Sequence, residues 1–329
     1  MPDLALSLAI SAYDHVMDLV RGRVRAEGIA LTTSELPNEE IFFRMLHFGE
    51  WDVAEFSMGK YASLAAAGAP PFRAIPVFPS RAFRQSSLYV AANAGITGAA
   101  DLAGRRVGIP EWAQTAGIYA RAYLQHQCNV ALRDIHWVQG GLNEAGRKEK
   151  VSVAPPPGVA IETVQERSLT EMLLSGDLDA VVSAREPAAF LAGDSRIKRL
   201  WPHCRPLEEA YYRATGIFPI MHVIVIRSAT LDQNPWIAMN LFKAFEEAKR
   251  NTLQGLASAT TSRIPVPWSQ YALRDAQKVF GEDCWPYGLD PNRRTLESFL
   301  QYCCEQGVTD RKMQIEELFP REFSKIVRV

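Results

Sequence analysis

The chain has 329 residues, enough for two domains that each bury a core of their own. Its 36 Lys and Arg residues nearly balance its 37 Asp and Glu residues, so no global field favours nucleic acid or a membrane surface as a partner. The five cysteines are odd in number and lack the spacing of a zinc site, which argues against a disulfide scaffold and predicts no metal centre.

The N-terminal apolar run contains an acid, Asp3, and no basic segment, so we expect no export signal. No stretch approaches 18 uninterrupted apolar residues, and we therefore expect no transmembrane helix. Together these observations predict a cytoplasmic protein.

Strand-like and helix-like segments alternate along the chain, which is typical of α/β proteins. The expected strands are 4–10, 30–36, 52–56, 73–79, 86–92, 105–109, 134–138, 159–164, 178–183 and 220–227. The expected helices are 14–21, 38–48, 57–67, 114–127, 168–175, 206–214, 235–257, 268–280 and 292–306. In the second of these helices Asn38 can cap, Glu39 and Glu40 suit the positive N-terminus, and Gly49 ends it.

Two strand-like runs, 75–90 and 216–226, are flanked by different halves of the chain and predict two crossings between two lobes. Lobe I would comprise 1–88 and 219–329, with a helical C-terminal extension, and lobe II would comprise 89–218. A ligand cleft would lie between them, lined by strand-to-helix loops. The charged, proline-rich segment 146–157 is expected to be an exposed excursion of lobe II.

Lobe I offers candidates after its first and third expected strands. Tyr13 and His15 lie in the first loop, where an imidazole can transfer a proton, although His15 can equally be a solvated residue of the first helical turn. Glu55 ends the strand 52–56 and can act as a base or bind a phenol. Ser57 can contact a substrate or simply cap the next helix.

The crossings supply Arg81, Arg84 and His222. Two guanidinium groups beside a hinge can clamp a carboxylate, or they can be solvated residues of a surface turn. His222 lies in an apolar run, where a histidine is more often a core residue, but its place at the hinge can bring it to the cleft.

Lobe II offers the segment from Glu111 through Gln114 to Thr115, at the start of the helix 114–127. Free backbone N–H groups and a hydroxyl at a helix N-terminus suit an anion, although many helices start this way without a ligand. Arg185 follows the strand 178–183 and can face the cleft, or it can pair with Glu186 or Asp179. Nucleotide, serine-hydrolase and zincin motifs are absent from the sequence.

Several separated segments resemble the 4,5-dihydroxyphthalate decarboxylase family. They are RML (44–46), EWDVAE (50–55), FRAIPVFPSR (72–81), FR (83–84), GIPE (108–111), IHW (135–137) and TGIFPIMH (215–222). The resemblance covers most of residues 4–250 and implies the two-lobed fold of type II periplasmic solute-binding proteins. This chain has Gln85 where the family pattern often has a histidine, so its substrate can be a different hydroxylated aromatic acid.

The resemblance implies a cofactor-independent decarboxylase of a hydroxylated aromatic carboxylic acid, which would convert 4,5-dihydroxyphthalate or a close analogue to protocatechuate or its equivalent. Since the sequence has no metal-ligand spacing, we expect a metal-independent reaction, although a metal site can still assemble in space from His15, Glu55 and His222. Carboxylates would be held by Arg81, Arg84, Arg185 and the helix N-terminus at Thr115. Glu55 would engage a phenol, and His15 or His222 would protonate the ring carbon.

Two other functions remain open from the sequence. A non-catalytic binding or sensor protein for a small aromatic carboxylate can use the same fold, although an export signal would be expected of a transport receptor. Small biosynthetic enzymes of the futalosine or thiamine-precursor routes can also use it, but we find none of their histidine or cysteine signatures. The apolar helical tail allows a homodimer.

Overall fold

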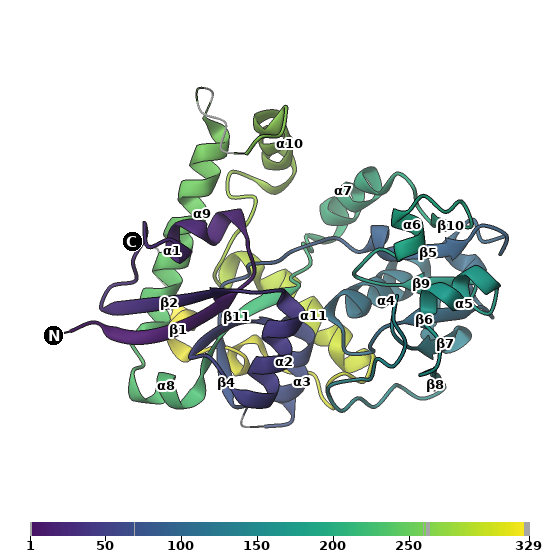
Figure 1. Cartoon of the computed structure of the whole chain (residues 1–329), viewed down its shortest axis with the longest axis horizontal. Coiled ribbons are helices and arrows are strands. Elements are labelled where there is room, and N and C mark those ends of the chain that lie inside the picture. Colours follow the sequence, from purple (N-terminus) through teal and green to yellow (C-terminus); the bar gives the residue numbers. More distant parts are fainter. Residues whose placement is uncertain (1, 69, 259, 261–263, 326–329) are drawn as a thin grey trace.

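Two separate β-sheets form the centres of two lobes in the computed structural model, which describes residues 2–68, 70–258, 260 and 264–325 (Figure 1). Within these residues the first sheet has the order β2 (Ile29–Glu35), β1 (Leu4–Ile10), β3 (Val53–Ser57), β11 (His222–Arg227) and β4 (Phe72–Ile75). The second has the order β10 (Ile197–Arg199), β5 (Leu88–Ala91), β9 (Ala180–Val182), β6 (Arg106–Ile109), β7 (His136–Gln139) and β8 (Ile161–Thr163).

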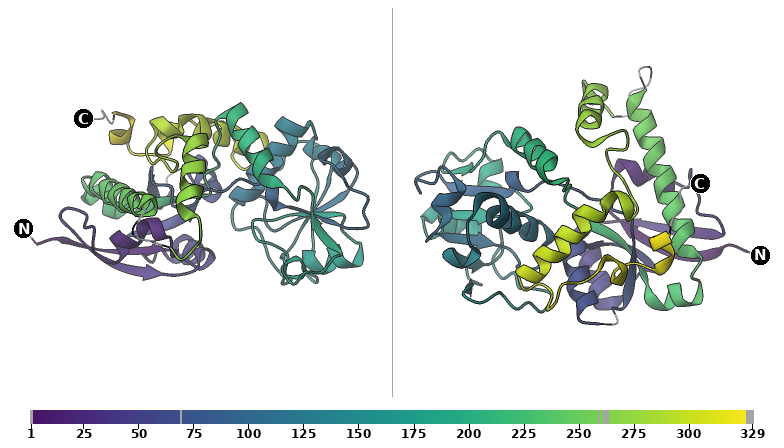
Figure 2. Two further views of the ribbon diagram at one scale, coloured as in Figure 1. Left: turned by 90° about the horizontal axis from the view of Figure 1, so that it is seen from above. Right: turned by 180° about the vertical axis from the view of Figure 1, so that it is seen from behind.

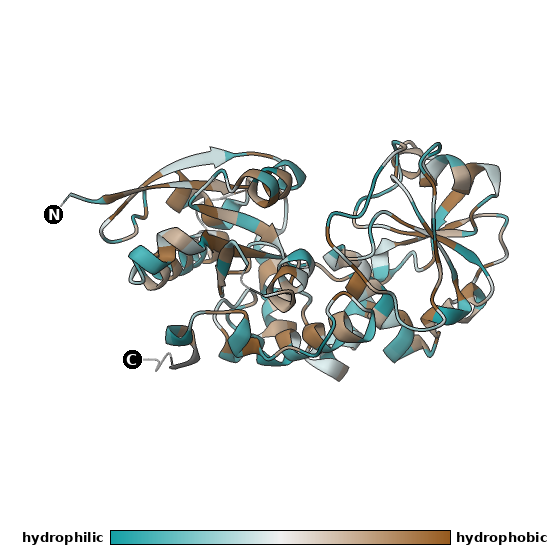
Figure 3. Cartoon of the chain, turned by 90° about the horizontal axis from the view of Figure 1, so that it is seen from below, coloured by the Kyte–Doolittle hydropathy of each residue, from teal (hydrophilic) through white to brown (hydrophobic). Residues whose placement is uncertain are grey.

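Helices pack around both sheets, and Figure 3 shows hydrophobic residues in the strands and hydrophilic residues on the outer helices and loops. Buried apolar residues of the strands and helices form the core. The helices are α1 (Met17–Val20), α2 (Asn38–Phe48), α3 (Met58–Ala66), α4 (Thr115–Cys128), α5 (Leu169–Ser175), α6 (Ala188–Leu191), α7 (Cys204–Thr215), α8 (Ser228–Gln233), α9 (Ile237–Ala257), α10 (Ser269–Phe280) and α11 (Arg293–Glu305). Short 3-10 segments occur at Asp14–Val16, Gln85–Ser87, Ala99–Leu102, Leu132–Asp134, Asp290–Asn292, Ile315–Glu317 and Arg321–Lys325.

Most of the predicted elements are confirmed, with informative exceptions. The strand predicted at 73–79 ends at Ile75, because the following Pro76 has no N–H to continue the ladder. The short elements β10, α6 and α8 were not predicted. No helix among the described residues is both long enough and apolar enough to cross a membrane.

Strand β3 occupies the middle of the first sheet and is buried along its whole length. It pairs in parallel with β1 and antiparallel with β11, and this second pairing sets Ile224 opposite Glu55 and His222 opposite Ser57. A strand buried on both faces normally carries only apolar residues, so the carboxylate of Glu55 is an exception that calls for polar partners. Those partners lie at the site described below.

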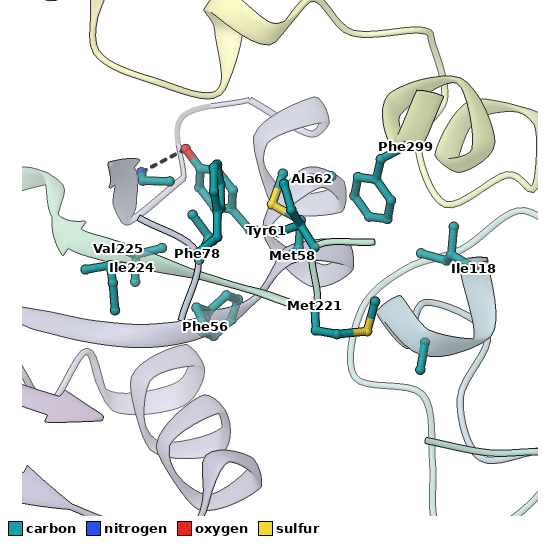
Figure 4. Packing of buried hydrophobic residues seen from close by; sticks show 14 of the residues in the cluster. Phe56, Met58, Tyr61, Ala62, Phe78, Ile118, Met221, Ile224, Val225 and Phe299 are labelled. Atoms are coloured by element: carbon teal, nitrogen blue, oxygen red, sulfur yellow. Dashed lines mark hydrogen bonds between the residues drawn. The ribbon is translucent and has the colours of Figure 1, made fainter. Parts of the chain in front are cut away.

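Apolar side chains join the first sheet to the second lobe beneath the cleft. Phe56 packs against Phe72 with ring centroids 4.7 Å apart. Figure 4 shows Phe56, Met58 and Met221 on one side and Ile118 of α4 on the other. Each fully buried side chain of this size contributes about 1.5–3 kcal/mol relative to exposure, so this shared core supports a defined separation of the lobes.

The two predicted crossings, 75–90 and 216–226, run side by side around Arg81 and Ile220. Arg81 and Ile220 form an antiparallel bridge, and the N–H of Met221 donates to the carbonyl of Ser80 at 2.8 Å. The double crossing is thereby confirmed. The lobe boundaries, 1–88 with 219–329 and 89–218, stay a prediction.

Helix α11 makes a further connection between the lobes, which is visible from behind in Figure 2. Its Phe299 stacks on Tyr119 of α4 at 5.1 Å between ring centroids. Just beyond the helix, the side chain of Gln306 accepts a hydrogen bond from Nε of the buried Arg121 at 2.8 Å. The backbone carbonyl of Gln306 accepts one from Nε1 of Trp112 at 2.7 Å. The C-terminal segment therefore packs on both lobes.

Candidate active site

A cavity of about 180 Å³ lies between the lobes. A cavity of about 150 Å³ suffices for benzene, so this one suits a single substituted aromatic ring. The lobe around the first sheet contributes Asn38, Glu39, Phe42, Ser57 and Lys60. The crossings contribute Ser80, Arg84, Met221 and His222. The lobe around the second sheet contributes Gln114, Thr115, Ala116, Arg147, Lys150, Ala184 and Arg185.

A buried carboxylate and a histidine form the chemical centre of this site. Oε1 of Glu55 lies 2.5 Å from Nδ1 of His222 and accepts a hydrogen bond from the Tyr13 hydroxyl at 2.5 Å. Oε2 accepts from the backbone N–H of Ser11 at 2.9 Å. The hydroxyl of Tyr13 also lies 3.2 Å from Nδ1 of His222. The polar partners required by the buried Glu55 are thus all present.

The charge of Glu55 is stabilised although its side chain is fully buried. Burial alone would raise the pKa of Glu55, but the charge of His222 and the hydrogen bonds from His222, Tyr13 and Ser11 outweigh burial and hold that pKa below its ordinary value. Burial and the nearby Glu55 raise the pKa of Tyr13 well above its ordinary value, so Tyr13 keeps its proton and donates it to the carboxylate.

His222 presents one ring nitrogen to the cavity. Its Nδ1 is engaged by Glu55, its ring packs edge-on against Phe42 at 4.9 Å, and 14% of its side chain is exposed. Since the residue lines the pocket, Nε2 is the nitrogen left to face a bound molecule. A histidine oriented by a buried carboxylate on one nitrogen can carry a proton on the other.

The structure corrects two predictions about this centre. Glu55 is not among the residues that line the pocket, so it is not placed to engage a phenol directly, and its carboxylate contacts His222 instead. His15 is not among the residues that line the pocket, and its ring packs between Tyr13 and Trp285. Burial, and next the charge of Lys249, lower the pKa of His15 to about 4, so it stays neutral near pH 7. His222 is therefore the better-placed proton donor.

The N-termini of α3 and α4 face each other across the cleft. The hydroxyl of Thr115 accepts a hydrogen bond from the N–H of Gly59 at 2.9 Å and lies 3.0 Å from the hydroxyl of Ser57. A Cβ at Gly59 would lie 2.7 Å from the carbonyl oxygen of Ala113, so only glycine permits this approach. Ser57 does not cap α3 by its own side chain, and Thr115 of the opposite lobe satisfies that N-terminus instead.

Glu111, predicted to contact substrate, lies instead behind the wall of the pocket and organises its cations. Its carboxylate is fully buried, pairs with the buried Lys60, and receives Nε and Nη2 of Arg147 at 2.7 Å and 2.6 Å. Nζ of Lys150 lies 3.5 Å away. Burial would raise the pKa of Glu111, but these three cations, led by Lys60, hold it below its ordinary value. Glu111 thus fixes positive groups that themselves line the pocket.

Arg84 differs from these cations because it has no carboxylate partner within ion-pair distance among the described residues. The hydrogen bond recorded for its side chain is from Nε to the sulfur of Met221 at 3.1 Å. Burial lowers the pKa of Arg84 to about 10, which still leaves the guanidinium charged near pH 7. A half-buried guanidinium that lines a pocket and has no such partner in the described part of the chain is well suited to a carboxylate ligand.

The other predicted arginines have different places. Arg185 lines the pocket, as does Gln114, and Arg185 lies 3.7 Å from Glu39 rather than pairing with Glu186 or Asp179. Arg81 is buried away from the pocket and donates to the carbonyls of Phe218 and Pro286 at 3.1 Å and 2.8 Å, and to Asn292. We therefore remove Arg81 from the candidates for carboxylate binding, because its guanidinium is used to join the crossings to the C-terminal segment.

Sequence reasoning missed Lys60, Arg147, Lys150 and Glu39. The segment 146–157, predicted to be an exposed excursion, places Arg147 and Lys150 in the pocket wall because the buried Glu111 requires counter-charges. Within the described ranges, no group of three or more His, Cys, Asp and Glu side chains is arranged to hold a metal ion.

Two proteins named 4,5-dihydroxyphthalate decarboxylase resemble the chain along its sequence. The one from Comamonas testosteroni is 36% identical over 320 residues, which cover 97% of each chain. The chain belongs to the 4,5-dihydroxyphthalate decarboxylase family. The second relative, from Pseudomonas putida, is 39% identical over 215 residues, which cover 65% of this chain and 83% of that protein. Membership in the family makes the chain a decarboxylase, that is, a carboxy-lyase.

Solved structures share the fold of this family member at low sequence identity. They include the periplasmic aliphatic sulphonate-binding protein SsuA of Escherichia coli, at a TM-score of 0.55 and 14% identity over 98% of this chain and 99% of that one. The desulfurization enzyme DSZB gives 0.51 and 16% over 97% of each chain. These matches confirm the predicted two-lobed, periplasmic-binding-protein-like fold. No protein-family model matches the sequence.

Proposed function

We propose that this family member decarboxylates a hydroxylated aromatic carboxylic acid, and that the substrate is 4,5-dihydroxyphthalate or a close analogue. The observation that supports the proposal best is the pair of His222 and Glu55 beside a small cavity rich in cations. The proposal includes a cytoplasmic location, a small aromatic carboxylate as the ligand, and a reaction that needs no cofactor or metal.

The charge of the cavity matches a dicarboxylate. Among the described residues that line it, five are cationic: Lys60, Arg84, Arg147, Lys150 and Arg185. Glu39 and Glu111 neutralise part of this charge, and positive charge remains in excess. A ring with two adjacent carboxylates carries two negative charges near pH 7, so the excess favours it over a neutral phenol.

The reaction exchanges a carboxylate for a proton on one ring carbon. A ring hydroxyl para to that carbon supplies electron density, and Nε2–H of a protonated His222 delivers the proton to the carbon. The C–C bond to the carboxylate then breaks, its electron pair restores the aromatic ring, and CO₂ leaves. Glu55 stabilises the charged imidazole before the transfer, and water re-protonates His222 after each turnover.

Arg84 is the group that we assign to the carboxylate that stays on the ring. It is the pocket arginine without a carboxylate partner among the described residues, so binding a substrate there displaces no internal ion pair. Uncharged polar groups of the wall, Asn38, Ser57 and Gln114, are available to the ring hydroxyls.

A non-catalytic binding protein is the second candidate, because a cation-lined cleft in this fold can also hold an acid without reaction. To separate the two functions, purified protein is incubated with 4,5-dihydroxyphthalate and related hydroxybenzoates, with and without chelator, and CO₂ is followed. We expect catalytic turnover that the chelator does not reduce. Binding of these acids without release of CO₂ would overturn the decarboxylase proposal.

The proton donor is tested by single replacements of histidines. We expect His222→Asn to lose about 10²–10⁴-fold in turnover, the usual contribution of a positioned acid. His47→Asn, on the exposed end of α2, is the matched control and should keep normal turnover. A larger loss for His15→Asn than for His222→Asn would show that the assignment is wrong.

A further inference from the structure

An ion-pair cluster joins the two lobes where the cavity meets a second hollow, a place that we call the mouth of the cavity. Glu39 lies in the first turn of α2, on the first lobe, whereas Arg147 and Arg185 belong to the second lobe (Figure 1). The second hollow, of about 380 Å³, adjoins the first and shares Glu39, Arg147, Lys150 and Arg185 with it. The cluster therefore lies in the wall common to both hollows.

The two carboxylates bound by Arg147 are held very differently. Glu111 is fully buried, and Nε and Nη2 of Arg147 both contact its Oε1, at 2.7 Å and 2.6 Å, while its Oε2 pairs with Lys60. These are short, charge-assisted contacts. Glu39 is 34% exposed and meets the same guanidinium only at 3.3–3.4 Å. It lies 3.7 Å from Arg185. Glu111 is thus a permanent partner, and Glu39 is an exchangeable one.

We propose that Glu39 is a resident carboxylate that occupies the cations of the cleft mouth and is displaced from Arg147 and Arg185 by a carboxylate of the incoming substrate. This inference rests on the proposed function for the identity of the substrate. Glu39 then acts as a specificity residue, since only a ligand that replaces its negative charge can pass the mouth without leaving Arg185 unpaired and Arg147 with Glu111 as its one carboxylate partner.

The proposal predicts the sign of the change in affinity when Glu39 is replaced. Replacing a glutamate that binds the substrate would weaken binding, whereas replacing a glutamate that competes with the substrate for the same arginines would strengthen it. A partly exposed ion pair contributes up to about 1 kcal/mol, so we expect Glu39→Gln to tighten the binding of a dicarboxylate by about fivefold. The gain should shrink with added salt, because part of the pair is exposed.

The test measures binding of phthalate, which lacks the activating hydroxyls, to the full chain by calorimetry at low and high salt. The control is Glu40→Gln, one residue along the same helix, where the carboxylate pairs with Arg44 at 2.8 Å and not with the cleft. We expect tighter binding for Glu39→Gln alone, and a fall in KM for the reacting acid with kcat little changed.

Weaker or unchanged binding of phthalate by Glu39→Gln would overturn the inference, as would failure of both the wild type and the variant to bind phthalate. Equal tightening in Glu40→Gln would overturn it too, because the effect would then be one of net charge. Failure of the proposed function is distinct: tighter phthalate binding by the variant, with no CO₂ from any hydroxylated acid, would leave the exchange at the mouth standing and remove the decarboxylase.

Discussion

Replacing Glu55 by glutamine tests the role of the buried carboxylate behind His222, because the two side chains have the same shape. In the native site one oxygen of Glu55 accepts from Tyr13 and His222 at 2.5 Å each, and the other accepts from the N–H of Ser11 at 2.9 Å. A glutamine has one acceptor oxygen and one donor NH₂. One of its two ends must therefore face an unsuitable partner.

Both orientations of the introduced glutamine impair the proton donor. If its NH₂ faces His222, then Nδ1 must accept a hydrogen bond, which favours the neutral ring over the protonated ring that delivers the proton. If its NH₂ faces Ser11 instead, two donors meet, at a cost of about 1–3 kcal/mol, and the charge that stabilises an imidazolium is still gone. Removal of the carboxylate behind a catalytic histidine costs about 10⁴ in kcat in the best-studied example, which is about 5.4 kcal/mol.

We therefore expect Glu55→Gln to lower kcat by about 10³–10⁴-fold while phthalate binding changes little, since the side chain does not line the pocket. CO₂ release under saturating substrate measures the rate, and calorimetry measures the binding. Asp52→Asn is the matched control: it precedes the same strand, accepts from the N–H and hydroxyl of Ser7 at 3.0 Å and 2.9 Å, and lies away from the cleft. Turnover above a tenth of the wild-type value in Glu55→Gln would refute the reasoning.

Three further predictions concern the pocket arginine Arg84, the contact between the lobes at Gly59, and the buried carboxylates. Arg84→Met should raise KM for a dicarboxylate by about 10–150-fold, which is the free energy of a hydrogen bond to a charged group expressed as a ratio of binding constants. An unchanged KM in initial-rate measurements would contradict the role of Arg84 in binding the substrate carboxylate. Gly59→Ala should lower Tm because its Cβ would lie 2.7 Å from a carbonyl oxygen and 2.9 Å from the Ile118 side chain. The control Gly98→Ala has open space around it and should leave Tm unchanged. Equal effects of the two variants in thermal melts would argue against a tight contact between the lobes. The pKa values of the Glu55 and Glu111 carboxyl groups are held low in the folded state. The stability that these groups contribute is therefore present above the ordinary carboxyl pKa of about 4.3 and is lost as the pH falls through the lowered values. Urea unfolding midpoints that stay constant down to about pH 3 would contradict this prediction.

The fold could be predicted largely from local patterns. Helix α2 spans Asn38–Phe48 and ends at a left-handed Gly49 as expected, because the acidic first turn, the apolar spacing and the glycine agree there. The cap expected at Asn38 is wrong: Asn38 is the first helical residue, and Pro37 occupies the N-cap position without a side-chain hydrogen bond. The double crossing could be inferred from two isolated strand-like runs. Strand β10 was missed because two of its three residues, Lys198 and Arg199, are charged and give no apolar strand pattern.

The candidate site was less predictable, because it depends on pairings between distant parts of the chain. The register of β11 against β3 brings His222 to Glu55, and no local pattern encodes a pairing across that separation. His15 has the same chemistry as His222 in the sequence, and only burial behind Tyr13 and Trp285 distinguishes it. Arg147 looked solvated because its neighbours are charged, while its buried partner Glu111 lies in another segment.

The hydrogen bond from Arg121 to Gln306 is a third connection between the lobes, besides the two crossing segments. Two crossing segments alone form a hinge about which two lobes can rotate. A third connection away from that hinge, made by the fully buried guanidinium of Arg121, restricts this rotation. We therefore expect local movement of the loop that carries Arg147, rather than hinge opening of the two lobes, to let molecules enter and leave the cavity.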